Sequence, residues 1–154
     1  MDSLKIPTTP QNPLPDRITR WIREDGGDHA LLLITVDGYI RPHIMMLARD
    51  EVAVISGTHL KVALGERTQS AENLRLRASA TIAIYDADLA CVIKTRVTSA
   101  LRPLMPGKVA CDLAIEDIRL DTPAADEATA RLATGLRFEG RPARDDIQSR
   151  LRNA

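Results

Sequence analysis

The sequence predicts a small antiparallel β-barrel with a few flanking helices. Six or so segments have the composition of strands and are joined mostly by short hairpin turns, whereas three or four segments have helical spacing. Strands and helices do not alternate regularly, which argues against a doubly wound α/β sheet. One long alternating segment, residues 108–121, changes phase at Glu116-Asp117, as a strand with a β-bulge does, and long bulged strands are typical of small barrels.

At 154 residues the chain is expected to form a single domain over residues 1–154. Residues 1–12 are polar and contain prolines, and we expect an extended N-terminal arm there. Apolar side chains at helical spacing then predict an amphipathic helix over residues 15–25, which prolines precede and Gly26-Gly27 ends. Trp21, the only tryptophan, is expected to anchor this helix in the core.

The next two segments predict a β-hairpin. Residues 30–36 are almost entirely apolar, and Asp37-Gly38 is a strong hairpin signal. The chain returns over residues 39–48, where Pro42 requires a sheet edge, a bulge or the start of a strand because it cannot donate a backbone hydrogen bond. The apolar residues 52–55 follow, and the pattern leaves their state open.

Residues 59–85 combine two predicted strands with a polar turn and a short helix. The first strand, residues 59–64, alternates between polar and apolar side chains. The turn from Gly65 to Ser70 then carries a guanidinium and two hydroxyls, and a helix is expected over residues 71–77, with Ser70 as its N-cap and Asn73 in its first turn. A second strand at residues 81–85 closes the unit.

This turn has the residue types of an anion site. It gathers free backbone N–H groups, the positive end of a helix dipole and the cation Arg67, and together these suit a phosphate. The same residues also fit an ordinary strand–helix junction, in which Ser70 only caps the helix and Arg67 is a solvated surface charge.

The remainder of the chain predicts one more strand, a loop and C-terminal helices. Residues 90–99 are expected to form a strand with Lys94 and Arg96 on one face, and residues 101–107 a loop. C-terminal helices are expected within residues 123–152. The first follows Thr122, ends at Gly135 and is expected to bury Ala125, Ala128, Leu132 and Ala133. The last covers about residues 143–152, with Ile147 and Leu151 one turn apart.

Composition excludes several classes of partner. The formal net charge is +0 and aromatic residues make up 3%, so the chain offers neither a basic field nor stacking platforms for nucleic acid. We expect no membrane segment, since no apolar run reaches transmembrane length. Cys91 and Cys111 lie in apolar runs without metal-site spacing, and we expect buried free thiols in a cytoplasmic protein.

Other catalytic signatures are missing from the sequence. The three histidines are scattered, so we expect no metal site, and no G-x-S-x-G elbow, P-loop or dinucleotide fingerprint is present. Lys94 fits a solvated strand face as well as a binding role, and Met45 and Met46 fit a core as well as a ligand wall. His43 fits a structural histidine as well as a cofactor contact.

The motifs in their order along the chain resemble a family. Thr35 to Ile44 contain T-x-D-G-x-x-R-P-H, and Arg67 to Arg75 contain R-T-x-S-A-E-N-L-R, followed by an apolar strand and by a strand with a lysine. This order over about residues 30–121 resembles the pyridoxamine 5'-phosphate oxidase-like FMN-binding proteins, which have a split β-barrel of antiparallel strands.

The resemblance implies a homodimer with FMN sites at the subunit interface and a small-molecule substrate. Arg67, Thr68 and Ser70, with Gln69 between them, fall where the family grips the flavin phosphate, and Asn73 falls where it supports this turn. Lys94 would be a second cation near the phosphate or the ring edge. The strand from His43 to Leu47, which includes Met45 and Met46, would lie along the isoalloxazine ring.

The resemblance does not extend to every feature of the oxidase. The chain is shorter, and it lacks the further Arg/His set that a pyridoxal-phosphate substrate would require, so we do not expect vitamin B6 oxidation. Two hypotheses follow. The first is an FMN-dependent oxidoreductase acting on an unidentified small molecule. The second is a non-catalytic module on the same barrel, which binds flavin, deazaflavin or haem, or which holds no cofactor and serves as a sensor or interaction protein.

Overall fold

The computed structural model describes residues 13–24, 28–87, 89–121, 132–141 and 145–154. The helices are α1 (Asp16–Arg23), the 3-10 helix η1 (Arg49–Glu51), α2 (Gln69–Leu76) and α3 (Asp145–Asn153). The strands are β1 (Ala30–Val36), β2 (Pro42–Ala48), β3 (Val52–Ser56), β4 (His59–Gly65), β5 (Ser79–Asp86), β6 (Leu89–Val97), β7 (Arg102–Met105) and β8 (Lys108–Leu120). The predicted arm over residues 1–12 lies outside the described residues.

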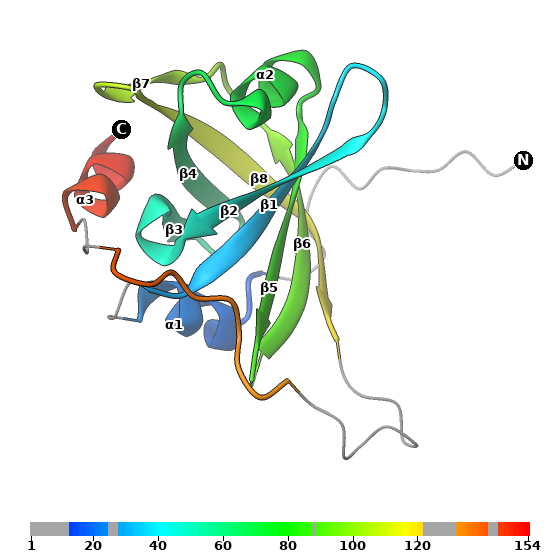
Figure 1. Ribbon diagram of the computed structural model, residues 1–154, viewed down its shortest axis with the longest axis vertical. Helices are drawn as coiled ribbons and strands as arrows, with labels where there is room; N and C mark the ends of the chain where they lie inside the picture. Colours follow the sequence, from blue (N-terminus) through cyan, green and yellow to red (C-terminus); the bar gives the residue numbers. More distant parts are fainter. Residues whose placement is uncertain (1–12, 25–27, 88, 122–131, 142–144) are drawn as a thin grey trace, which may run out of the picture.

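The strands form one antiparallel sheet that curls into a half-barrel (Figure 1). Their order is β2-β1-β5-β6-β8-β4-β3, and β7 pairs with β8 beside this path. The strands at the two ends of this path, β2 and β3, do not pair with each other, so the barrel is open between them. In the chain they are connected by η1. The β-rich class that the sequence predicts is confirmed.

The β1–β2 hairpin confirms both strands and the position of the proline. Pro42 is the first residue of β2, and β2 is an edge of the sheet, so its missing N–H breaks no ladder. The predicted start of this strand at Tyr39 is wrong. The Asp37 carboxylate instead accepts hydrogen bonds from the backbone N–H groups of Tyr39 and Arg41, at 2.8 and 2.9 Å, which closes a longer loop. Ile40 in that loop has a positive φ of 61°.

The predicted β-bulge in β8 is confirmed. Lys94 of β6 pairs with Asp117, whereas its neighbour Thr95 pairs with Ile115, so Glu116 is the extra residue. The bulge lets the apolar residues on both sides of it face the same core. This inward face of β8 carries Val109, Cys111, Leu113, Ile115 and Ile118.

Each end of the half-barrel carries a helix, and a third helix packs outside it (Figure 1). At one end, α1 places Ile18, Trp21 and Ile22 in the main core, as the spacing of its apolar residues predicts. At the other end, α2 contacts β1, β2 and β4. On the outside, α3 buries Ile147 and Leu151 against three alanines of β3, β4 and β8, namely Ala53, Ala63 and Ala110.

The structure corrects one predicted loop, assigns the segment whose state was left open, and describes little of the predicted helix after Thr122. The expected loop at residues 101–107 contains the short strand β7, and the undecided residues 52–55 belong to β3. The predicted helix after Thr122 lies mostly outside the described residues. Leu132, expected to be buried by that helix, is 46% exposed and not helical.

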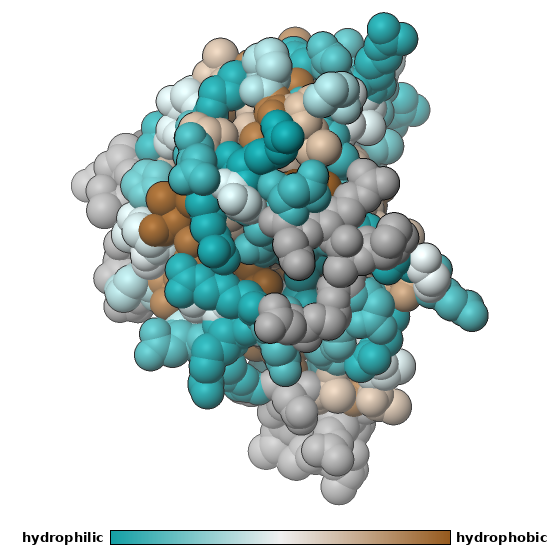
Figure 2. Space-filling view, turned by 90° about the vertical axis from the view of Figure 1, so that its left-hand side faces the viewer, coloured by the Kyte–Doolittle hydropathy of each residue, from teal (hydrophilic) through white to brown (hydrophobic). Residues whose placement is uncertain are grey.

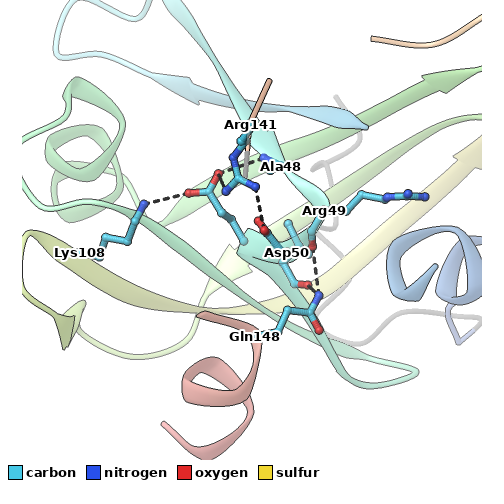
Figure 3. Close-up of polar contacts among 8 residues, drawn as sticks. Ala48, Arg49, Asp50, Lys108, Arg141 and Gln148 are labelled. Atoms are coloured by element: carbon cyan, nitrogen blue, oxygen red, sulfur yellow. Dashed lines mark hydrogen bonds and ion pairs between the residues drawn. The ribbon is translucent and has the colours of Figure 1, made fainter. Parts of the chain in front are cut away.

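A buried network of charges fixes η1 to the elements around it (Figure 3). The Glu51 carboxylate accepts hydrogen bonds from the backbone N–H of Ala48 and from Lys108 Nζ, at 3.0 and 2.9 Å. Arg141 Nη1 donates to the Asp50 carboxylate at 2.7 Å, and Gln148 of α3 donates to the carbonyls of Arg49 and Val52. These contacts hold α3 and residue 141 onto the sheet, so we assign the network a structural role.

Apolar side chains are unevenly exposed over the surface. The face around α3 is mainly hydrophilic, with apolar residues exposed only in small groups (Figure 2). On the outer face of β2, by contrast, Ile44 and Met46 are 60% and 53% exposed. Such exposed apolar side chains on neighbouring positions of one strand mark a surface suited to a partner.

Candidate functional site

The turn between β4 and α2 is built around Thr68. Thr68 Oγ1 donates a hydrogen bond to the Gly65 carbonyl at 2.8 Å and accepts one from the backbone N–H of Ala71 at 3.2 Å. Thr68 is therefore the N-cap of α2, and the prediction that Ser70 caps it is wrong. The physical reason is that the extended backbone of Thr68, with ψ of 155°, places its hydroxyl over the first turn two residues before the predicted position.

Gly65 keeps this turn tight. A Cβ added at Gly65 would lie 2.8 Å from Thr68 Cγ2, closer than any ordinary contact. The Thr68 side chain cannot easily move away, because both of its hydrogen bonds run through the same hydroxyl.

The turn contains several donors that have no partner within the described protein. Within the described part of the chain, the backbone N–H groups of Gln69 and Ser70 have no acceptor, as is usual for the first turn of a helix. The Ser70 hydroxyl is buried and has no hydrogen-bond partner. Arg67 is exposed and forms no ion pair with a described residue. These groups, unlike the Thr68 hydroxyl, are not committed to the fold.

Asn73 links the first turn of α2 to β1. Its side chain is buried, donates to Thr35 Oγ1 of β1 at 3.0 Å and accepts from Gln69 Nε2 at 2.8 Å. At the other end of α2, Arg77 Nε donates to the Asp37 carbonyl at 3.1 Å. The helix is thus tied to β1 and to the β1–β2 loop, which fixes the direction in which its first turn points.

The residues predicted along β2 lie on two faces. His43, Met45 and Leu47 point to the inner face, whereas Met46 points outward with Ile44. His43 pairs with Thr35, the residue that Asn73 holds, so the inner end of β2 lies beside α2. Leu47 is fully buried in the core, so neither its side chain nor its backbone is exposed to a ligand.

Lys94 lies on the outer face of the sheet. The strand registers align Lys94 of β6 with Thr81, Ile34 and Ile44 in one row across the sheet. Three strand spacings of about 4.8 Å therefore separate Lys94 from Ile44. Lys94 and Met46 share this outer face, whereas the α2 turn, His43 and Met45 lie on the other side.

The outer face of these strands is a continuous apolar surface, which we call the apolar face. The pairing registers place its apolar side chains on adjacent strands. It consists of Leu32, Ile34, Ile44, Met46 and Val92, with the buried Ala83 lying between Leu32 and Val92. The sequence signal for this face is the unbroken apolar run of β1, which is typical of a strand covered on both faces and offers surface to bury in a dimer.

Cavities also occur elsewhere in the described structure. One of about 800 Å³ lies at the α1 end and is lined by arginines of that helix, by Trp21 and by Asp86. Another, of about 440 Å³, lies between the end of α2 and residues 97–101. Neither cavity is lined by the turn at residues 65–70.

The two cysteines are buried and free. Burial raises the pKa of the Cys91 thiol to about 11 and that of the Cys111 thiol to about 12. Both are therefore protonated and unreactive at neutral pH, and the prediction of buried free thiols is confirmed.

No group of three or more His, Cys, Asp or Glu side chains in the described part of the chain is placed to hold a metal ion. No described helix has the length and apolar character needed to cross a membrane.

No protein-family model and no curated protein sequence matches the chain. Several solved structures resemble it at low sequence identity. A candidate pyridoxamine 5'-phosphate oxidase from Lactobacillus delbrueckii is 14% identical, with a TM-score of 0.58, over 70% of this chain and 93% of that chain. The styrene monooxygenase flavin reductase of Pseudomonas putida S12 is 9% identical, with a TM-score of 0.53, over 61% and 81%. An F420 reductase is 13% identical, with a TM-score of 0.50, over 60% and 90%.

These likenesses show the fold. The chain has the split-barrel architecture of pyridoxamine 5'-phosphate oxidase-like proteins and flavin reductases, as the order of its motifs predicts.

Proposed function

We propose that this protein binds FMN and acts as an oxidoreductase on a small molecule, as a homodimer with flavin sites between its two copies. The observation that carries the proposal is the set of uncommitted donors at the start of α2: Arg67, the N–H groups of Gln69 and Ser70, and the Ser70 hydroxyl. The fold supports it, since a flavin reductase is among the structures that share this architecture.

The donors at this turn fit a phosphate dianion. Two backbone N–H groups at a helix start and one guanidinium supply the charge-assisted hydrogen bonds that such a group needs. The Thr68 hydroxyl already caps the helix, so we assign it the role of shaping the turn. Asn73 holds the turn in place through Thr35, and Gly65 keeps its backbone close.

The ring would lie along β2. His43 and Met45 lie on the same side of the sheet as the α2 turn, and the edge position of β2 leaves backbone groups available. A bound flavin would supply the redox chemistry, while this chain would orient the ring and exclude water around it. The substrate is proposed only as a small molecule.

A second copy accounts for the remaining predicted site residues. Met46 and Lys94 lie on the outer side of the sheet and cannot join the turn from the same copy. Packing two copies through the apolar face would bury Ile44 and Met46 and would bring Lys94 to the interface. The buried free thiols support a cytoplasmic setting for the dimer.

The test is a titration of the purified, cofactor-free protein with FMN, followed by its visible spectrum. We expect saturable binding at micromolar FMN or below and a protein-bound flavin spectrum. The Arg67→Ala variant should bind FMN at least ~10-fold more weakly, because it removes a charge-assisted hydrogen bond worth about 1.4 kcal/mol or more. Arg75→Ala, which removes an exposed arginine from the last turn of the same helix, is the matched control. Absence of any FMN binding by the wild-type protein would overturn the proposal.

A second candidate is a deazaflavin-binding or non-catalytic module on the same barrel. The likeness to an F420 reductase favours a deazaflavin, since F420 belongs to that class. Binding of F420 in preference to FMN would support this alternative. Flavin binding without turnover of NADH or NADPH would support the non-catalytic form. If the protein binds neither FMN nor F420, the alternatives left are a haem-binding module and a module without a cofactor.

A further inference from the structure

The cavity at the α1 end of the half-barrel is built from four separate parts of the chain. Its walls come from α1, from His29 just before β1, from the β5–β6 hairpin and from Arg137. Its volume of about 800 Å³ lies within the range of small-molecule sites. It lies at the opposite end of the molecule from α2, and therefore away from the proposed flavin turn (Figure 1).

The lining of this cavity is positively charged. Four arginines line it, at positions 17, 20, 23 and 137, against the two carboxylates of Glu24 and Asp86, so its formal charge is four minus two, or +2, with His29 neutral. The chain as a whole has a formal net charge of +0. The described lining of the cavity thus carries an excess of positive charge, which Asp28 beside Arg137 partly offsets.

Both carboxylates are already engaged by other groups. Asp86 accepts a hydrogen bond from Trp21 Nε1 at 2.8 Å and lies 3.2 Å from His29 Nδ1. Burial disfavours ionisation of Asp86, but the hydrogen bonds from Trp21 and from the Ala87 N–H outweigh it, so the pKa of Asp86 is lowered and it stays charged. The Glu24 carboxylate lies 3.6 Å from Nη1 of Arg49, and the Arg49 guanidinium also lies over the Trp21 ring.

The arginines are left without equivalent acidic partners. Arg17 and Arg20 lie three residues apart on one face of α1, are exposed, and form no ion pair with any residue that the structure describes. Arg137 lies 3.8 Å from Asp28, at the limit of an ion pair, and Arg23 donates to the Val54 carbonyl. Guanidinium groups in this arrangement suit two or more phosphate or carboxylate groups.

An apolar and aromatic wall completes the cavity. Trp21 and Leu89 line it beside the arginines. The Trp21 ring is held by Asp86, by Arg49 and by an edge contact with His29, with centroids 5.8 Å apart. The wall is therefore fixed before any ligand binds, which lowers the entropic cost of binding.

From this geometry we propose that the cavity at the α1 end binds a small organic polyanion, carrying two or more phosphate or carboxylate groups, at a site separate from the flavin turn. Arg17 and Arg20 contact the anionic groups, and Trp21 contacts the carbon framework of the ligand.

The position of Trp21 makes the proposal directly measurable, because it is the only tryptophan in the chain. The flavin-free protein is titrated with pyrophosphate and, separately, with citrate, with sodium chloride at equal ionic strength as the reference, while tryptophan fluorescence is followed. We expect a saturable change with at least one of the two anions, and the preferred one distinguishes a phosphate-bearing from a carboxylate-bearing ligand. No saturable change with either anion would overturn the proposal.

Paired variants separate a site from general ionic attraction. The double variant Arg17→Ala/Arg20→Ala should weaken binding at least ~10-fold. The double variant Arg150→Ala/Arg152→Ala removes the same charge from exposed positions of α3 and should bind as the wild type does. Equal weakening in both pairs would refute the proposal.

Arg137→Gln, which should also weaken binding, provides a second test should the α1 pair not fold. FMN affinity should be the same in all these variants, so failure here does not bear on the flavin turn.

Discussion

Thr68 and Ser70 divide the two roles that a hydroxyl can have at the start of a helix. Thr68 caps α2 and is fully committed, whereas Ser70 is buried within the first turn and uncommitted. Both residues fit the usual N-cap preference, so the sequence pattern could not decide between them. The choice depends on the backbone of Thr68, which the tight turn at Gly65 sets.

The capping role of Thr68 is testable by substitution. Thr68→Val keeps the shape of the side chain but removes both hydrogen bonds, and should lower the free energy of unfolding by about 1 kcal/mol. Thr68→Ser retains the hydroxyl and should differ from the wild type by no more than about 0.5 kcal/mol. Urea denaturation of both variants measures the difference. Equal stability of the two would show that the hydroxyl does not cap α2.

Among the elements, the long strands and terminal helices follow from local patterns. The alternation in β4 and β8 and the bulge at Glu116 are properties of neighbouring residues, and the sequence predicts them. For Pro42 the sequence predicts only an edge, a bulge or a strand start, and the structure shows an edge strand that begins there. The strands β3 and β7 are short, with bounds Val52–Ser56 and Arg102–Met105, and their state depends on pairing with β4 and β8. A local pattern cannot predict such pairing.

The contribution of α3 can be measured at one buried position. Ile147 packs on three alanines of the sheet, so Ile147→Ala should leave a cavity and lower the free energy of unfolding by about 2–4 kcal/mol. Arg150→Ala changes an exposed residue of the same helix and should alter that energy by less than about 0.5 kcal/mol. Thermal and urea unfolding compare the two. A loss no larger for Ile147→Ala than for Arg150→Ala would show that α3 does not pack on the sheet as described.

At the scale of the whole molecule, the predicted site divides between two sides of the sheet. The turn at residues 65–70 is contiguous in sequence, and its cluster of donors was therefore predictable. The separation of Met46 and Lys94 from that turn depends on the registers of β1, β2, β5 and β6, which no sequence motif encodes. The arginine-lined cavity was not predicted either, because its walls come from segments far apart in the chain.

The proposed dimer follows from the placement of Met46 and Lys94 on the outer side of the sheet, away from the turn at residues 65–70. Met46→Lys places a charge on the apolar face, at its exposed β2 edge, and should convert a dimer into a monomer, or weaken it at least ~100-fold, because burying an unpaired charge costs several kcal/mol. Ile55→Lys is the control, since Ile55 is an exposed apolar residue of β3 at the opposite end of the strand order. Light scattering gives the mass of each. A monomeric wild-type protein, or dissociation by both substitutions alike, would contradict packing through the apolar face.

The central claim is that the turn before α2 recognises the phosphate of a flavin, and a comparison of FMN with riboflavin tests it most directly. The two ligands share the ring and differ in the phosphate, so their affinities for wild-type protein and for Arg67→Ala give a complete cycle. We predict that wild-type protein binds FMN at least ~10-fold more tightly than riboflavin, and that Arg67→Ala loses most of this difference with little change in riboflavin affinity. Equal affinity of the wild-type protein for both ligands, or an FMN preference that Arg67→Ala leaves intact, would contradict the claim.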